Sequence, residues 1–156
     1  MNKINDFVGL VTLYRQSDEY FLYRASTQAS IEASLTNHLL PYFGAIKLNE
    51  LDTSLIESWL NTLKYTPPIK GGCNGEHLSE STIYNLWILL RRILEFAYEK
   101  NILIDNPCSS VSWDIRPHLP IHAPSFIYDI FEFDNFLDQL FSQKKLAAKV
   151  KNALLA

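Results

Sequence analysis

Three observations predict an all-α fold for this chain. Apolar residues recur at spacings of three and four over several stretches, as they do on one face of a helix. Residues that cap helices precede several of these stretches, and no run alternates apolar and polar residues as a half-buried strand does. With 156 residues, of which 47% are apolar and 20% charged, the chain is long enough to fold around one sizeable core.

The first helix is expected over residues 4–15. Its apolar face consists of Ile4, Phe7, Val8, Val11 and Tyr14. It is expected to end near Ser17 and Asp18.

The second helix is expected to begin where Ser26 or Thr27 accepts a backbone N–H as N-cap. Its apolar residues are Ile31, Leu35, Leu39 and Tyr42. Pro41 shortens the last turn, and Gly44 is expected to end the helix in the left-handed conformation that glycine permits.

The third helix is expected to begin at Asp52 or Thr53 and to end before Pro67 and Pro68. Its apolar side consists of Leu55, Ile56, Trp59, Leu60 and Leu63. Glycines and turn-forming residues fill the stretch between Thr66 and Leu78, which predicts a flexible surface loop.

The longest helix is expected to follow Ser79 as N-cap and to run to about residue 100. Its apolar face consists of Ile83, Leu86, Trp87, Leu90, Ile93, Leu94 and Ala97, so we expect it at the centre of the core. At about 100° per residue, the opposite face is polar and free to contact a partner. This face holds Ser81, Asn85, Arg92 and Glu99, with Tyr84 and Arg91 at its edge.

An extended linker without periodicity is expected over residues 108–124, after the turn at Asn106 and Pro107. A last helix is expected from about residue 129 to about residue 153. It carries four aromatic residues between Phe131 and Phe141, which is more apolar surface than a solitary tail should expose.

Charge and cysteine content exclude several classes of protein. The net charge is −3, with 14 Lys and Arg against 17 Asp and Glu. The chain therefore lacks the strongly basic character that would by itself indicate a nucleic-acid partner. Cys73 and Cys108 are too isolated to indicate a zinc site or a disulfide framework, so we expect no metal or other cofactor. The N-terminus lacks a signal-peptide pattern and no apolar run is long enough for a membrane span, which favours a soluble cytoplasmic protein.

The order of features from Ala25 to Val111 carries a family resemblance. Its first part is Leu39-Leu40-Pro41-Tyr42-Phe43-Gly44, then Leu48, Leu51-Asp52, Ile56 and Trp59-Leu60. Its second part is Leu78-Ser79, Thr82-Ile83, Leu90-Arg91, Ile93-Leu94, Ala97-Tyr98, Ile102 or Ile104, and Asn106-Pro107. This pattern resembles the core-binding domain, the SAM-like N-terminal domain, of tyrosine recombinases of the phage-integrase family.

The resemblance implies a four-helix SAM-like bundle that clamps one face of duplex DNA, while a second domain cleaves and rejoins the strands. It implies an N-terminal entry helix over 1–20, the core-binding domain over 21–111, a linker over 112–125 and the start of a catalytic domain over 126–156. The implied partners are a double-stranded recombination site, the missing catalytic domain and other integrase protomers. A bacterial or phage-type cytoplasm, with association to the nucleoid, and a role in DNA integration and recombination by a mobile element follow from it.

The catalytic residues of that family are missing from this sequence. The residues three positions after His38, His77, His118 and His122 are Pro41, Glu80, Ile121 and Ser125, so no His-x-x-Arg motif exists. The sequence stops about where the first catalytic arginine would be expected. We therefore expect a truncated integrase that is not an enzyme as it stands.

Four basic residues are candidate phosphate contacts: Arg24, Lys47, Arg91 and Arg92. Thr27 and Gln28 join Arg24 at a helix start, where free N–H groups favour a phosphate, although plain N-capping explains Thr27 equally well. The alternative for Arg91 and Arg92 is a solvated face on which they pair with Glu95 and Glu99.

Two further residues, Tyr84 and Asn85, could reach base edges in a groove, although simple surface exposure explains them better. His38 and His77 are interpreted as surface histidines. Trp59, Trp87 and Trp113 are interpreted as core or linker anchors rather than stacking platforms, and Asp134 with Asp138 is not a catalytic pair.

The favoured function is therefore a DNA-binding module of a tyrosine recombinase that grips a recombination site without cutting it. The alternative is a helical protein-interaction module whose aromatic C-terminal helix docks into a partner groove. A small helical enzyme is the least favoured reading, because no nucleophile, base and oxyanion donor can be placed together.

Overall fold

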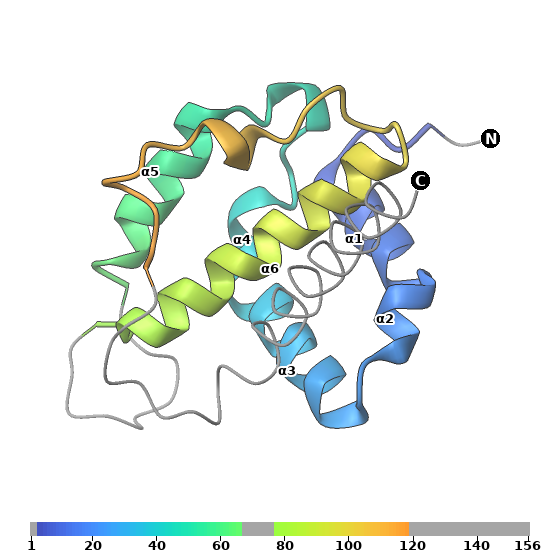
Figure 1. Ribbon diagram of the computed structural model, residues 1–156, viewed down its shortest axis with the longest axis horizontal. Coiled ribbons are helices and arrows are strands. Elements are labelled where there is room, and N and C mark those ends of the chain that lie inside the picture. The colour runs from blue at the N-terminus through green and yellow to red at the C-terminus, as the bar shows by residue number, and fades with distance from the viewer. Residues whose placement is uncertain (1–2, 67–76, 119–156) are drawn as a thin grey trace, which may run out of the picture. The chain divides into compact units, whose positions relative to one another are not determined.

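The computed structural model describes residues 3–66 and 77–118 (Figure 1). Contacts divide the chain into one unit of residues 1–121 and a second of residues 122–156. The part described is helical, and its only β-type pairing is an isolated bridge between Asp6 and Lys47. The all-α prediction is confirmed for these residues. The expected helix over 129–153, most of the expected loop and the end of the expected linker lie outside them.

The first helix, α1 (Phe7–Arg15), starts three residues later than expected. The carboxylate of Asp6 caps it by accepting a hydrogen bond of 2.8 Å from the backbone N–H of Gly9. The residues just before it bond elsewhere, because Leu48 donates its backbone N–H to the carbonyl of Asn5 at 2.8 Å. This pairing holds the chain extended up to Asp6 and so sets where the helix begins.

A short helix that the sequence analysis missed, α2 (Asp18–Leu22), follows directly. Ser17 closes one helix and opens the next: its hydroxyl donates to the carbonyl of Tyr14 at 2.6 Å and accepts from the backbone N–H of Tyr20 at 3.2 Å. Tyr20 is the buried residue of this five-residue helix. No apolar periodicity accompanies so short an element, which is why pattern analysis did not find it.

The next helical stretch is continuous and consists of α3 (Ala25–Ser34), a π-helical turn η1 (Leu35–Leu39) and α4 (Leu40–Phe43). The backbone N–H of Leu40 bonds to the carbonyl of Leu35, five residues back, just before Pro41, which has no N–H to continue the regular pattern. Its buried apolar residues are Ile31, Leu35, Leu39 and Phe43. The first three were predicted, whereas Phe43 takes the place expected for Tyr42, which is half-buried.

Two capping predictions for this stretch are wrong. The N-cap is Arg24, whose carbonyl accepts from the backbone N–H of Gln28 at 2.9 Å, while Thr27 lies inside the helix and is buried. Gly44 has a right-handed φ of −55°. It is needed for space instead, because a Cβ there would lie 2.5 Å from the carbonyl oxygen of Leu40. The left-handed residue is Asn101, with φ of 57°, after the end of the long helix.

The remaining helices follow the predictions closely. After a 3-10 turn η2 (Leu48–Glu50), α5 (Thr53–Leu63) begins at the predicted N-cap Asp52, whose carboxylate accepts from the N–H of Leu55 at 2.8 Å. The predicted N-cap Ser79 opens α6 (Glu80–Glu99), which crosses the centre of the unit between α5 and α1 (Figure 1). All predicted apolar residues of α6 are buried, and Ile88, Leu89 and Phe96 are buried as well.

The segment after α6 is packed onto the bundle where an extended linker was expected. Asn106 caps a 3-10 turn η3 (Pro107–Ser110), and its side chain also donates to Glu95 at 2.8 Å and to the carbonyl of Arg91 at 3.4 Å. Thr53 donates to the carbonyl of Pro107 at 3.0 Å, and Glu57 accepts from the N–H of Ser112 at 3.0 Å. Residues 106–112 are therefore tied to both α5 and α6.

Across residues 3–66 and 77–118, no helix is both long enough and apolar enough to cross a membrane.

Candidate nucleic-acid interface

Of the three residues proposed at the start of α3, one is an exposed cation and two have side chains with structural roles. Arg24 is exposed at the N-cap position. The amide of Gln28 donates to the backbone carbonyls of Tyr20 at 2.9 Å and Tyr23 at 3.3 Å, so it ties α3 to the end of α2. With Thr27 buried, Arg24 is the residue of this group that faces solvent.

The two arginines in the middle of α6 differ in their exposure and in their contacts. Arg91 is exposed, whereas the Nε of Arg92 forms an ion pair of 2.5 Å with the carboxylate of Glu19 on α2. The expectation of a free polar face is therefore wrong at Arg92. Glu95, one of the alternative partners expected for these arginines, accepts a hydrogen bond from Asn106.

Two carboxylates organise the polar contacts around α2. The Glu19 cluster consists of Glu19, Arg92, Tyr14 and Tyr23, and both tyrosine hydroxyls donate to the same carboxylate oxygen, at 3.3 and 3.1 Å. The Glu32 cluster consists of Glu32, Arg15 and Tyr20. In it, Arg15 bonds both carboxylate oxygens at 2.9 and 2.7 Å, and the hydroxyl of Tyr20 donates at 2.7 Å.

The pKa values of the Glu32 cluster follow from these contacts. The hydrogen bonds from Arg15 lower the pKa of Glu32 below its usual value. Burial, supported by the bond to Glu32, raises the pKa of Tyr20 to about 12. At neutral pH the cluster therefore holds a carboxylate, a guanidinium and a neutral phenol.

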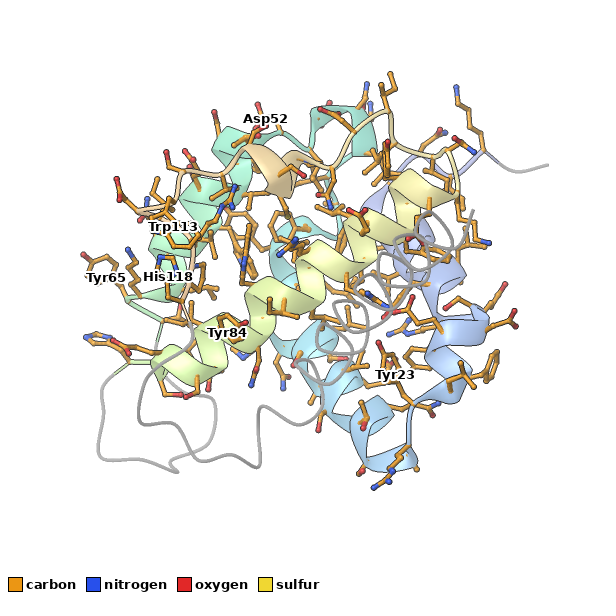
Figure 2. All side chains as sticks on the ribbon, viewed as in Figure 1. Tyr23, Asp52, Tyr65, Tyr84, Trp113 and His118 are labelled. Atoms are coloured by element: carbon orange, nitrogen blue, oxygen red, sulfur yellow. The ribbon has the colours of Figure 1, made fainter. Side chains whose placement is uncertain are left out.

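Tyr84 and Asn85 lie half-buried in the first half of α6, where Figure 2 shows Tyr84. The carboxamide oxygen of Asn85 is buried and accepts no hydrogen bond from the described residues. That atom is one of the two that would pair with adenine, so the geometry gives less support to base reading by Asn85 than the sequence did.

The exposed cations among the proposed residues are Arg24, Lys47 and Arg91, and none of them forms an ion pair within the described residues. Arg24 precedes the helical stretch 25–43 and Lys47 follows it. These two residues flank opposite ends of the stretch, which at ~1.5 Å per residue is roughly 30 Å long. They would have to contact different phosphates on a duplex.

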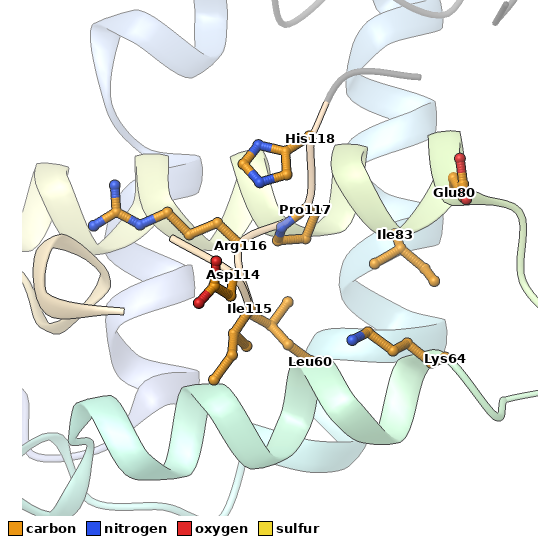
Figure 3. Close-up of a pocket in the computed structure, with 9 residues that line it drawn as sticks. All are labelled: Leu60, Lys64, Glu80, Ile83, Asp114, Ile115, Arg116, Pro117 and His118. Atoms are coloured by element: carbon orange, nitrogen blue, oxygen red, sulfur yellow. The ribbon is translucent and has the colours of Figure 1, made fainter. Parts of the chain in front are cut away.

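A pocket that the sequence analysis missed opens between α5, the start of α6 and residues 114–118, with a volume of about 320 Å³ (Figure 3). Beside it, Trp113 is 70% exposed and lies 4.6 Å, between ring centroids, from His118 (Figure 2). Of the two roles expected for Trp113, core or linker anchor, its exposure excludes the core, whereas Trp59 and Trp87 are buried as expected. Exposed side chains without periodicity leave no signal in a sequence pattern.

Two further titratable side chains, Cys108 and His38, have pKa values shifted by burial. Burial raises the pKa of the Cys108 thiol to about 12 and lowers the pKa of His38, which is partly buried. Within the described part of the chain, no group of three or more His, Cys, Asp or Glu residues could hold a metal ion.

Comparison with known proteins gives a family match for part of the chain. The sequence model of the family described as phage integrase, N-terminal SAM-like domain, matches residues 23–64. This segment runs from just before α3 to the end of α5 and includes Arg24 and Lys47. The predicted resemblance to the phage-integrase SAM-like domain is confirmed for it. No curated protein matches the chain.

Two solved structures are similar over most of the described unit. One is the solution NMR structure of the phage integrase SAM-like domain from Moorella thermoacetica, with a TM-score of 0.55 and 19% identity, covering 80% of this chain and 95% of that one. The other is the solution NMR structure of a fragment, 61–160, from Clostridium leptum, with a TM-score of 0.55 and 21% identity, covering 77% of this chain and 96% of that one. The fold is therefore that of a SAM-like helical domain.

Proposed function

We propose that this chain is a DNA-binding core-binding module related to tyrosine recombinases, which grips a recombination site by its phosphates. The observation that carries the proposal is the match of residues 23–64 to the phage-integrase SAM-like domain, because this segment holds two of the three proposed cations that are exposed and form no ion pair within the described residues. Arg24 and Lys47 at its two ends, with Arg91 on α6, would each neutralise a phosphate.

The proposed role is positioning rather than chemistry. The sequence contains no His-x-x-Arg motif, so we expect no strand cleavage or rejoining by these 156 residues. A role of this kind belongs to DNA integration or recombination by a mobile element, and it would place the protein on DNA in the cytoplasm.

The test is direct binding of the purified chain to a fluorescent duplex, measured by anisotropy at low salt. The proposal expects binding that weakens steeply with added salt, together with no covalent adduct on a nicked suicide duplex. Absence of duplex binding at low salt would contradict it, and a trapped covalent adduct would contradict the positioning role. The protein-interaction alternative depends on the aromatic helix expected over 129–141, which lies outside the described residues.

A further inference from the structure

The outer surface of α2 exposes two large apolar side chains at consecutive positions. Phe21 is 69% exposed and Leu22 is 86% exposed. Asp18 is also exposed, and it precedes them by three and four residues, which puts it on the same side of the helix. We call Asp18, Phe21 and Leu22 the α2 wedge.

The α2 wedge is held firmly from behind. The Glu19 and Glu32 clusters bond the inner side of α2, and Gln28 bonds the carbonyls of Tyr20 and Tyr23. Neighbouring helices α1, α3 and α6 all contribute to these contacts. The exposed apolar pair is therefore a fixed feature of the surface, of the kind that marks a protein contact.

The pocket between α5 and α6 has complementary chemistry. Its apolar lining consists of Leu60, Ile83, Ile115 and Pro117, with charged side chains around it (Figure 3). At the rim, Lys64 is exposed, and its ammonium group forms no ion pair or hydrogen bond within the described residues. Arg116, by contrast, already donates to the carbonyls of Val111 at 2.8 Å and Ser109 at 2.7 Å. Lys64 is thus the cation left available to a carboxylate.

We propose that the α2 wedge of one chain docks into this pocket of a second copy of the same chain. Figure 1 shows α2 and α5 on opposite sides of α6, so a wedge cannot enter the pocket of its own chain. Phe21 and Leu22 would cover the apolar lining while Asp18 pairs with Lys64 at the rim. The contact is head-to-tail, because the two surfaces are different patches of the molecule.

This inference goes beyond DNA binding and uses none of the cations that the proposed function needs. Neither surface contains Arg24, Lys47 or Arg91. A variant can therefore lose self-association and keep its affinity for duplex DNA, or the reverse.

The first experiment is sedimentation of the full chain and of two variants, Leu22→Asp in the wedge and Ile115→Asp in the pocket. Each variant alone should associate at least about tenfold more weakly than the parent chain, as expected for loss of a central apolar contact. An equimolar mixture should recover a complex, because each variant keeps the surface that the other lacks. A parent chain that is monomeric throughout, or association that survives Leu22→Asp, would overturn the proposal.

The second experiment is a charge exchange between the two surfaces. Asp18→Lys and Lys64→Asp should each weaken association several-fold, and the double variant should recover most of it, because the pair is restored with reversed signs. Asp105→Lys and Lys100→Asp are exposed controls that belong to neither surface and should change little. Thermal melting checks that every variant folds. Loss of duplex affinity in Leu22→Asp with unchanged association would assign the wedge to DNA and overturn the proposal.

Discussion

The helices α6 and α2 are fixed in the same unit by opposite means. Ten of the twenty residues of α6 are buried, whereas α2 buries Tyr20 and is otherwise held by the Glu19 and Glu32 clusters. Apolar burial leaves a periodic pattern in the local sequence, but the partner of Glu19 is Arg92, 73 residues away. The comparison teaches that the apolar core of this fold can be predicted from sequence, whereas polar contacts between residues far apart in the chain cannot.

The largest effect should come from the apolar core. Trp59 is 1% exposed and lies 5.1 Å from Phe43 between ring centroids. Trp59→Ala should lower the free energy of unfolding by about 3–5 kcal/mol, because it leaves a large cavity. Chemical denaturation measures this loss. Tyr65→Ala is the matched control, since Tyr65 is 74% exposed and its removal should cost within about 0.5 kcal/mol.

The second largest loss of stability should come from removing a buried polar side chain. Asn106 is 7% exposed and bonds Glu95, the carbonyl of Arg91 and the N–H of Cys108. Asn106→Ala leaves these groups without their partner and should cost about 2 kcal/mol. Equilibrium unfolding in urea measures the cost. A change within the error of the parent chain would show that residues 106–112 are not an integral part of the bundle.

Removing one of the polar side chains that bond α2 should lower the free energy of unfolding by a smaller amount. The ion pair between Arg92 and Glu19 is partly exposed, so Arg92→Ala should lower the free energy of unfolding by about 1 kcal/mol. Arg91→Ala, one position along the same helix, should stay within about 0.5 kcal/mol because Arg91 is exposed. Equal losses in the two variants would remove the distinction between them.

The Glu32 cluster should make stability depend on acid. Because Arg15 lowers the pKa of Glu32 in the folded chain, this carboxylate stabilises the fold at neutral pH. That contribution should begin to fall as the pH drops below the ordinary value of 4.5 and should disappear below the folded-state pKa. Glu32→Gln should therefore flatten the decline of the melting temperature in acid. Exposed Glu50→Gln, outside both clusters, should leave the decline unchanged.

The fold was predictable wherever it depended on short-range rules. Asp52 and Ser79 cap α5 and α6 as predicted, because a capping side chain bonds a backbone N–H three residues away. The start of α1 was not predictable in this way, because it depends on pairing with residues 46–48. The packed segment after Asn106 was missed for the same reason, since Thr53 and Glu57 hold it from more than fifty positions away.

The residue types of the candidate interface could be predicted from the sequence, but which of its cations are already paired with a carboxylate could not. Sequence analysis proposed Arg24, Lys47, Arg91 and Arg92 alike, since all four carry the charge that a phosphate needs. Only the packing of α2 shows that Arg92 already has a carboxylate partner. The α2 wedge and the pocket escaped prediction because exposure of an apolar residue breaks the periodic pattern instead of forming one.

The most direct test of the proposed function is the salt dependence of duplex binding by the chain and by Arg24→Ala/Lys47→Ala/Arg91→Ala. If each cation neutralises one phosphate, the slope of log K against log salt should become shallower by about 0.9 per residue, or roughly 2.7 in total. Lys100→Ala is the control for lost charge, because Lys100 is exposed on the opposite side of α6 from Arg91 at about 100° per residue. The account predicts that the slope is shallower by about 2.7 in the triple variant and unchanged in the control. An unchanged slope in the triple variant, with folding intact, would contradict DNA binding through these residues.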